Sequence, residues 1–155
     1  MDALARLIAT EEIKELVARR CRTLDAQDWE GYARCHTADI VSHAIGTELG
    51  KGEPVAGIDA VLAVLREQLA GRTTVHQVHS PEIRVAADRT AAGVWAMEDR
   101  LWWEHEGRSH WLHGFGHYYE QYVVEDGRWL VASRRLVRTR VDSGTGPSSA
   151  GAPPA

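Results

Sequence analysis

A histidine within a strand-like segment is the clearest candidate for chemistry in this chain. Residues 73–85 read TTVHQVHSPEIRV, and their β-branched side chains alternate with polar ones, which predicts a strand. His76 occupies a position where a purely structural strand would carry Val or Thr. Imidazole is the side chain whose ordinary pKa lies closest to neutral pH, so we interpret His76 as a proton-transfer base in a small hydrophobic pocket.

Three charged residues are predicted to face the interior together with this histidine. Arg20 lies in the middle of the apolar stripe of a predicted helix, and Asp25 lies at the edge of that stripe, near the helix end. Arg135 lies in an otherwise apolar row of the last predicted strand. Buried charges are costly unless they are paired. Either an arginine pairs with Asp25 as a structural bridge beside a neutral core histidine, or the four residues form an acid–base pocket.

The spacing of the remaining candidates predicts no metal, nucleophile or phosphate-binding loop. His76 and His79 are three residues apart, which places them on opposite faces of a strand. His113 and His117 share a face but lie about 13 Å apart along it. The chain has no Gly-x-Ser-x-Gly elbow and no Walker or dinucleotide-type glycine spacing. We therefore predict acid–base chemistry with no metal and no cofactor.

The elements that must position these residues change from helices to strands along the chain. Helices followed by long antiparallel strands predict an α+β fold in which a curved sheet covers the N-terminal helices. Residues 1–142 are predicted to form one domain, and the Gly, Ser, Pro and Ala of residues 143–155 a disordered tail. The predicted elements are helices beginning near Thr10, Asp28 and Ile58, a short strand at 39–45, and long strands at 73–86, 91–104, 110–124 and 128–140.

Both faces of the predicted sheet carry large apolar groups. One face is expected to cover the helices and the pocket, and the other to meet a partner subunit in a homodimer or homotrimer. In the predicted strand 91–104, alternation places Trp95 and Met97 on the same side. In the predicted strand 110–124, it places five side chains on the same side: Trp111, His113, Phe115, His117 and Tyr119.

Composition restricts the class of partner. The chain has 155 residues and a hydrophobic content of 44%, enough for one domain with its own core. Its 18 basic and 22 acidic residues give a net charge of −4, which argues against a nucleic-acid or anionic-membrane surface. We expect no signal peptide and find no run that approaches ~20 apolar residues. Cys21 and Cys35 form no metal motif and are expected as reduced thiols, so we predict a cytoplasmic protein.

Four stretches resemble the SnoaL-like branch of the nuclear transport factor 2 superfamily. They are residues 20–29 (RCRTLDAQDW), 74–78 (TVHQV), 112–118 (LHGFGHY) and Trp129 through Arg135, and the resemblance extends over residues 5–142. It implies a cone-shaped α+β barrel in which N-terminal helices pack in a curved, mainly antiparallel sheet. Members include scytalone dehydratase, bile-acid 7α-dehydratase, a hexachlorocyclohexane dehydrochlorinase, polyketide aldol cyclases and steroid isomerase, and many others only bind ligands or subunits.

The resemblance also implies roles for individual residues. Asp25 matches the helix-end aspartate and His76 the strand histidine of the dehydratase-type dyad. Arg135 resembles the last-strand arginine of the dehydrochlorinase and bile-acid enzymes. Arg20 stands where those enzymes have a lysine or a tyrosine, which favours a cationic group for a leaving anion or an oxyanion.

The resulting hypothesis is a cofactor-independent lyase of the dehydratase type. Asp25 would fix the tautomer of His76, which removes a proton, while Arg20 and Arg135 stabilise the oxyanion or leaving group. The second histidine of scytalone dehydratase has no match around residues 95–97, so His117 or His113 would supply the second acid. An isomerase or aldol-type cyclase with the same dyad, and a non-catalytic ligand-binding or dimerisation module, remain open. The predicted pocket for a small hydrophobic, ring-bearing substrate (a polyketide, terpenoid or steroid) is lined by Tyr32, Trp95, Met97, Trp111, His113 and Phe115.

Overall fold

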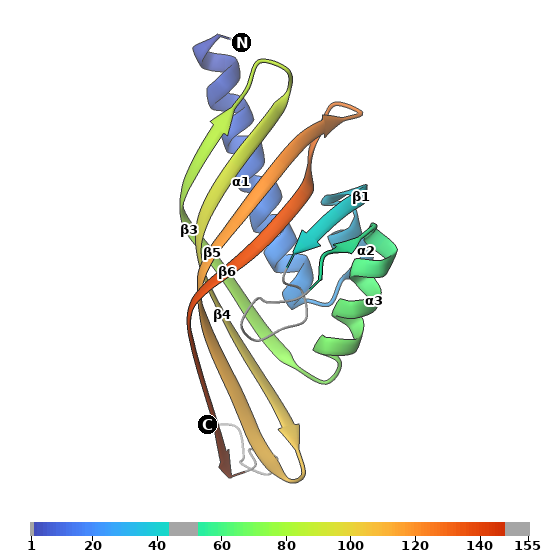
Figure 1. Cartoon of the computed structure of the whole chain (residues 1–155), viewed down its shortest axis with the longest axis vertical. Coiled ribbons are helices and arrows are strands. Elements are labelled where there is room, and N and C mark those ends of the chain that lie inside the picture. The colour runs from blue at the N-terminus through green and yellow to red at the C-terminus, as the bar shows by residue number, and fades with distance from the viewer. Residues whose placement is uncertain (1, 44–52, 148–155) are drawn as a thin grey trace.

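A computed structural model describes residues 2–43 and 53–147, in which three helices lie against one curved, open sheet of six strands (Figure 1). The strand order is β2-β1-β6-β5-β4-β3, with β1 parallel to β6 and every other pair antiparallel. The predicted α+β class is confirmed. The elements are α1 (Ala3–Asp25), α2 (Trp29–Ala33), β1 (His36–His43), β2 (Val55–Ala56), α3 (Ile58–Leu69), β3 (Thr73–Val85), β4 (Thr90–His105), β5 (Arg108–Glu125) and β6 (Arg128–Pro147).

Helix α1 begins earlier than its sequence signals predict. Asp2 is the N-cap, and its carboxylate accepts a hydrogen bond from the Ala5 N–H at 2.8 Å. Thr10, the predicted cap, lies inside the helix, where its hydroxyl donates to the Arg6 carbonyl at 2.9 Å. The Ala- and Leu-rich residues before Thr10 extend the helix because their helix propensity is high.

The four long strands form three hairpins with tight turns. Glu106-Gly107 and Asp126-Gly127 adopt positive φ at both residues, as two-residue hairpin turns require. Both turns lie in the gaps between the predicted strands, but the C-terminal end of the last strand differs from the prediction. Residues 143–147 pair with residues 108–112 of β5 and are therefore strand rather than tail. The rest of the predicted tail, residues 148–155, lies outside the described residues.

A β-bulge in β6 reverses which of its side chains face the helices. Tyr122 of β5 pairs with Val131, whereas its neighbour Gln121 pairs with Ser133, so Ala132 is an extra residue in β6. The inward series changes there from odd to even positions. Arg135, which strict alternation predicted to face inward, is therefore exposed, and Arg134 is buried in its place.

The core lies between the helices and the inner, concave face of the sheet. Helix α3 is amphipathic as predicted, with Val61, Leu62, Leu65 and Leu69 buried. Cys21 and Cys35 are buried free thiols. Among the described residues, no helix has the length and apolar character that crossing a membrane requires. The inner face of the sheet and the C-terminal end of α1 together form the frame of the candidate site.

Candidate active site

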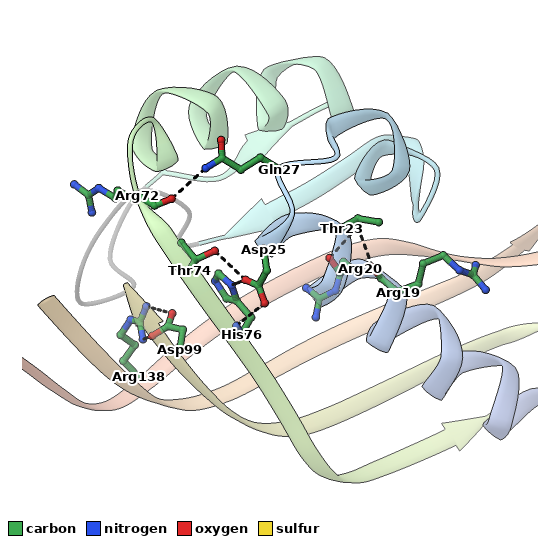
Figure 2. A network of polar contacts seen from close by, with 10 residues as sticks. All are labelled: Arg19, Arg20, Thr23, Asp25, Gln27, Arg72, Thr74, His76, Asp99 and Arg138. Carbon is green, nitrogen blue, oxygen red and sulfur yellow. Dashed lines mark hydrogen bonds and ion pairs between the residues drawn. The ribbon is translucent and has the colours of Figure 1, made fainter. Parts of the chain in front are cut away.

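Asp25 and His76 are in direct contact where the end of α1 meets strand β3 (Figure 2). The His76 Nδ1 lies 2.6 Å from Asp25 Oδ1, the Thr74 hydroxyl donates to the same oxygen at 2.9 Å, and the His76 backbone N–H donates to Oδ2 at 2.9 Å. A carboxylate oxygen can only accept, so Nδ1 carries the ring proton and Nε2 presents a lone pair. The side chains of His76 and Asp25 are 10% and 24% exposed, so the pair is shielded but reachable.

The position of His76 on an edge strand explains this contact. β3 is the last strand of the sheet, so alternate N–H groups along it point away from β4. The His76 N–H goes to Asp25, which makes His76 and its cross-strand neighbour Asp99 a non-hydrogen-bonded pair. Side chains approach most closely in such pairs, so Asp99 is the nearest carboxylate to His76 from the sheet.

Asp99 is neutralised by Arg138 above a glycine of β5. The Arg138 guanidinium donates to both carboxylate oxygens at 2.8 and 2.6 Å, and both side chains are more than nine-tenths buried. A Cβ at Gly114 would overlap both the Arg138 guanidinium and the Asp99 carboxylate. The absence of a side chain at Gly114 leaves room for a bidentate ion pair beside His76, and Figure 2 shows this pair.

Arg20 belongs to a buried network in the core. It forms an ion pair with Glu120 at 2.9 Å, and neither side chain is exposed by more than 2%. Glu120 accepts a hydrogen bond from the Tyr122 hydroxyl at 2.6 Å. The same hydroxyl accepts a hydrogen bond from the Trp95 indole N–H at 2.7 Å. Burial alone would lower the pKa of Arg20, but the adjacent Glu120 charge raises it above its ordinary value. The expected bridge between an arginine and Asp25 is therefore wrong.

Arg134 is an inward-facing arginine of β6 that forms no ion pair with the described residues, although Glu120 is its cross-strand neighbour. Its guanidinium lies 4.9 Å from the centre of the Tyr118 ring, and Arg20 lies 5.0 Å from the same ring. Within residues 2–43 and 53–147, Arg134 forms no ion pair, and its Nε has no hydrogen-bond partner. Arg134 therefore takes the inward place that was predicted for Arg135.

His36 is a buried histidine that sequence reasoning missed. Its Nδ1–H donates to the Tyr32 carbonyl at 2.8 Å, and its ring lies 4.4 Å from the buried Tyr32 ring. Burial, followed by the positive charge of Arg20, lowers the pKa of His36 to about 3. His36 is therefore neutral in the folded protein. Nothing in the local sequence distinguishes it from a surface histidine at the start of a strand.

The neutral His36 predicts a specific acid sensitivity of the fold. In the unfolded chain its pKa returns to near 6.5, so the unfolded state binds the proton first as the pH falls. Its stabilising contribution is complete above pH 6.5 and is lost between pH 6.5 and about 3, with about 2 kcal/mol lost by pH 5. Urea unfolding at pH 7.5 and 5.0 should show a smaller loss for His36→Gln than for the wild type. An equal loss in both proteins would contradict this assignment.

Four of the predicted site residues lie on the outer face of the sheet. The inward side of β5 carries Gly114, Gly116 and Tyr118, and the opposite side carries the residues that were predicted to join the dyad. One of these, His113, instead contacts Glu98 at 2.7 Å. The predicted pocket roles are therefore wrong for Trp111, His113, Phe115 and His117, whereas Tyr32, Trp95 and Met97 are buried on the helix side.

Comparisons with known proteins place this geometry in context. The SnoaL-like domain profile matches residues 5–135. A hexachlorocyclohexane dehydrochlorinase superposes with a TM-score of 0.79, covering 99% of each chain at 16% identity. A candidate scytalone dehydratase from Novosphingobium aromaticivorans superposes with a TM-score of 0.76, covering 96% of this chain and 97% of its own at 18% identity. A protein of unknown function from Mycobacterium tuberculosis is 26% identical, with a TM-score of 0.73 over 90% of this chain and 78% of its own.

Proposed function

Because this chain belongs to the SnoaL-like family of the nuclear transport factor 2 superfamily, we propose that it is a cofactor-independent lyase. Its substrate would be a small hydrophobic, ring-bearing molecule that loses a proton and a leaving group. The observation that carries this proposal is the 2.6 Å contact of His76 Nδ1 with Asp25, which leaves Nε2 as a base. The similarity to a dehydrochlorinase and a candidate scytalone dehydratase supports an elimination.

The dyad accounts for both halves of an elimination. His76 Nε2 takes a proton from a carbon next to a carbonyl, and the electrons of that C–H bond form the new double bond as the leaving group departs with its own pair. The resulting imidazolium is stabilised by Asp25, which accepts its Nδ1–H. When the leaving group is hydroxide, the proton held on Nε2 passes to it and gives water. Asp25 thus acts through His76, as the orienting carboxylate does in other base dyads.

Arg134 is the side chain that we assign to the developing negative charge. Arg20 and Arg138 are already neutralised by Glu120 and Asp99, so their net field at a substrate is small. Arg134 has no such partner among the described residues and lies on the inner face of the sheet. A buried cation without a counter-ion is costly, and an anionic transition state would provide that counter-ion.

Replacing Arg134 by methionine should therefore separate activity from stability. We expect kcat/KM to fall by about 10²- to 10³-fold, the effect of removing one preorganised transition-state contact. The free energy of unfolding should not fall by more than about 1 kcal/mol, because the change removes an unpaired buried charge. Arg135→Met, made at the exposed neighbour, is the matched control and should change neither quantity appreciably. Equal activity losses in both variants would contradict the assignment.

The reaction type can be tested before the natural substrate is identified. Incubation of 2-tetralone with the protein in D2O reports proton abstraction, because deuterium enters next to the carbonyl. Incubation of 3-hydroxycyclohexanone reports elimination through a loss of about 18 Da. We expect both, and neither with His76→Ala. Deuterium exchange without mass loss would favour the isomerase or cyclase, and the absence of both would favour a ligand-binding module.

We also propose that the outer face of the sheet packs against a second copy of the chain in a homodimer or homotrimer. Trp102, Trp111 and Tyr119 are between 39% and 46% exposed on this face, and aromatic residues of this kind are enriched in protein interfaces. Light scattering of the purified protein would distinguish a dimer, a trimer and a monomer, and the last would contradict the proposal.

A further inference from the structure

Gln27 links the end of α1 to the turn between α3 and β3 through two hydrogen bonds, and Figure 2 shows the one to Arg72. Its side-chain nitrogen donates to the Leu69 carbonyl at 3.1 Å and to the Arg72 carbonyl at 3.2 Å. These two carbonyls flank the turn that joins α3 to β3. Both hydrogens of the carboxamide are thereby used, and both acceptors are backbone atoms of a segment more than forty residues away in sequence.

The backbone of Gln27 is unusual for its residue type. Its φ is +52°, in the left-handed region that glycine adopts without a steric penalty and that helices commonly use just after their last turn. The helix end is closed around it, because the Gln27 N–H donates to the Leu24 carbonyl and the Asp28 N–H to the Thr23 carbonyl. A glutamine at a position that favours glycine indicates that its side chain supplies something glycine lacks.

The two hydrogen bonds of Gln27 and the three of Asp25 connect the same two segments. Gln27 lies two residues after Asp25, and Arg72 lies two residues before Thr74 and four before His76. The end of α1 therefore presents the Asp25 carboxylate and the Gln27 carboxamide. The facing segment presents the carbonyl that accepts from Gln27, followed by the groups that donate to Asp25. Fixing Arg72 relative to Gln27 sets where His76 stands along the carboxylate of Asp25.

We propose that Gln27 is a positioning residue that holds the Asp25–His76 dyad in register. The effect of Gln27 on catalysis rests on the proposed function, whereas its effect on the Asp25–His76 contact does not. In the absence of the Gln27 contacts, the helix end would be free to shift along β3, and the 2.6 Å contact between Asp25 and His76 would lengthen or be lost part of the time. Gln27 itself touches neither the imidazole nor a reacting atom.

Hydrogen exchange of the His76 backbone amide gives a direct measurement of this register. That N–H is bonded to Asp25 rather than to another strand, so its protection reports the docking of α1 on β3. We expect Gln27→Gly, which keeps the left-handed backbone and removes the carboxamide, to raise its exchange rate at least tenfold. The amide of Tyr118 in the central strand β5 should stay within about twofold of wild type, which distinguishes a local shift from general destabilisation.

Two further variants serve as controls for the exchange rate of the His76 amide. Arg89→Gly, at an exposed residue that also has a positive φ, measures the relief of backbone strain alone and should leave the His76 amide unchanged. The Asp25→Ala variant, which removes both carboxylate oxygens, is the reference for a disrupted dyad. A His76 amide that responds to Asp25→Ala but not to Gln27→Gly would overturn the positioning role and leave the proposed function intact. An amide that responds to neither would show that the dyad contact itself is absent.

A positioning role for Gln27 also predicts which kinetic constant changes in Gln27→Gly. With 2-tetralone in D2O, we expect Gln27→Gly to lower the kcat for deuterium incorporation about tenfold while KM stays within about twofold of wild type, because the Gln27 side chain contacts backbone carbonyls of the α3–β3 turn rather than the imidazole. An increase in KM with an unchanged kcat would contradict a positioning role, since it would indicate lost substrate binding rather than a displaced base.

Discussion

Asp25→Asn is expected to reduce kcat by about 10³- to 10⁴-fold while the protein stays folded. Three donors from β3 converge on the two oxygens of Asp25, and an asparagine offers only one oxygen and an N–H₂ group. The His76 Nδ1 would then accept a hydrogen bond from the amide N–H, so the neutral ring would carry its proton on Nε2. A protonated Nε2 cannot act as the base. The measurement is the rate of deuterium incorporation into 2-tetralone at saturating ketone.

The neighbouring carboxylate provides the control for this variant. Asp28 caps α2, where its Oδ1 accepts from the Gly31 N–H at 2.8 Å. Asparagine is an equally good cap, so Asp28→Asn should keep kcat within about twofold of wild type. If Asp25→Asn retained more than a tenth of wild-type activity, Asp25 would not set the tautomer of His76.

Arg20→Met is expected to have the largest effect on stability, about 3 to 5 kcal/mol in the free energy of unfolding. The substitution leaves the Glu120 carboxylate inside the core without its counter-ion, and among the described residues the Tyr122 hydroxyl remains as its hydrogen-bond partner. The double variant Arg20→Met/Glu120→Gln should recover most of the loss, because it removes both charges and keeps an acceptor for Tyr122. Urea unfolding followed by tryptophan fluorescence measures the difference.

A surface arginine on the same helix tests whether the stability loss of Arg20→Met comes from burial of the ion pair rather than from the loss of a positive charge. Arg19 is exposed next to Arg20, so Arg19→Met should change the free energy of unfolding by less than about 0.5 kcal/mol. A cost below 1 kcal/mol for Arg20→Met would indicate that Glu120 reaches water, contrary to the burial of both groups.

The residues that local patterns predict correctly are those whose position depends on one element at a time. The period of the hydrophobic residues predicts that Arg20 is buried on α1, and the limits of the long strands, except the end of β6, follow from alternation and turn residues. The contact of Asp25 with His76 joins a helix end to a strand start. Resemblance to a known family rather than periodicity suggested it.

The residues that could not be predicted depend on how strands pair. Alternation groups Trp111, Phe115 and His117 correctly, but it does not say which side of β5 faces the helices when both sides carry aromatic residues. The bulge at Ala132 moves the inward series of β6 by one residue and exchanges Arg135 for Arg134. The partner of Arg20 likewise depends on the register of β5, which places Glu120 on the inner face.

The central claim is that Asp25 holds the proton of His76 on Nδ1 and leaves Nε2 free to accept one. A long-range ¹H–¹⁵N correlation spectrum of the imidazole distinguishes the two neutral tautomers directly. We expect neutral His76 to carry its proton on Nδ1 in the wild type and on Nε2 in Asp25→Asn. A wild-type spectrum in which Nε2 is protonated and Nδ1 is bare would contradict this claim, because His76 would then have no lone pair directed at a substrate.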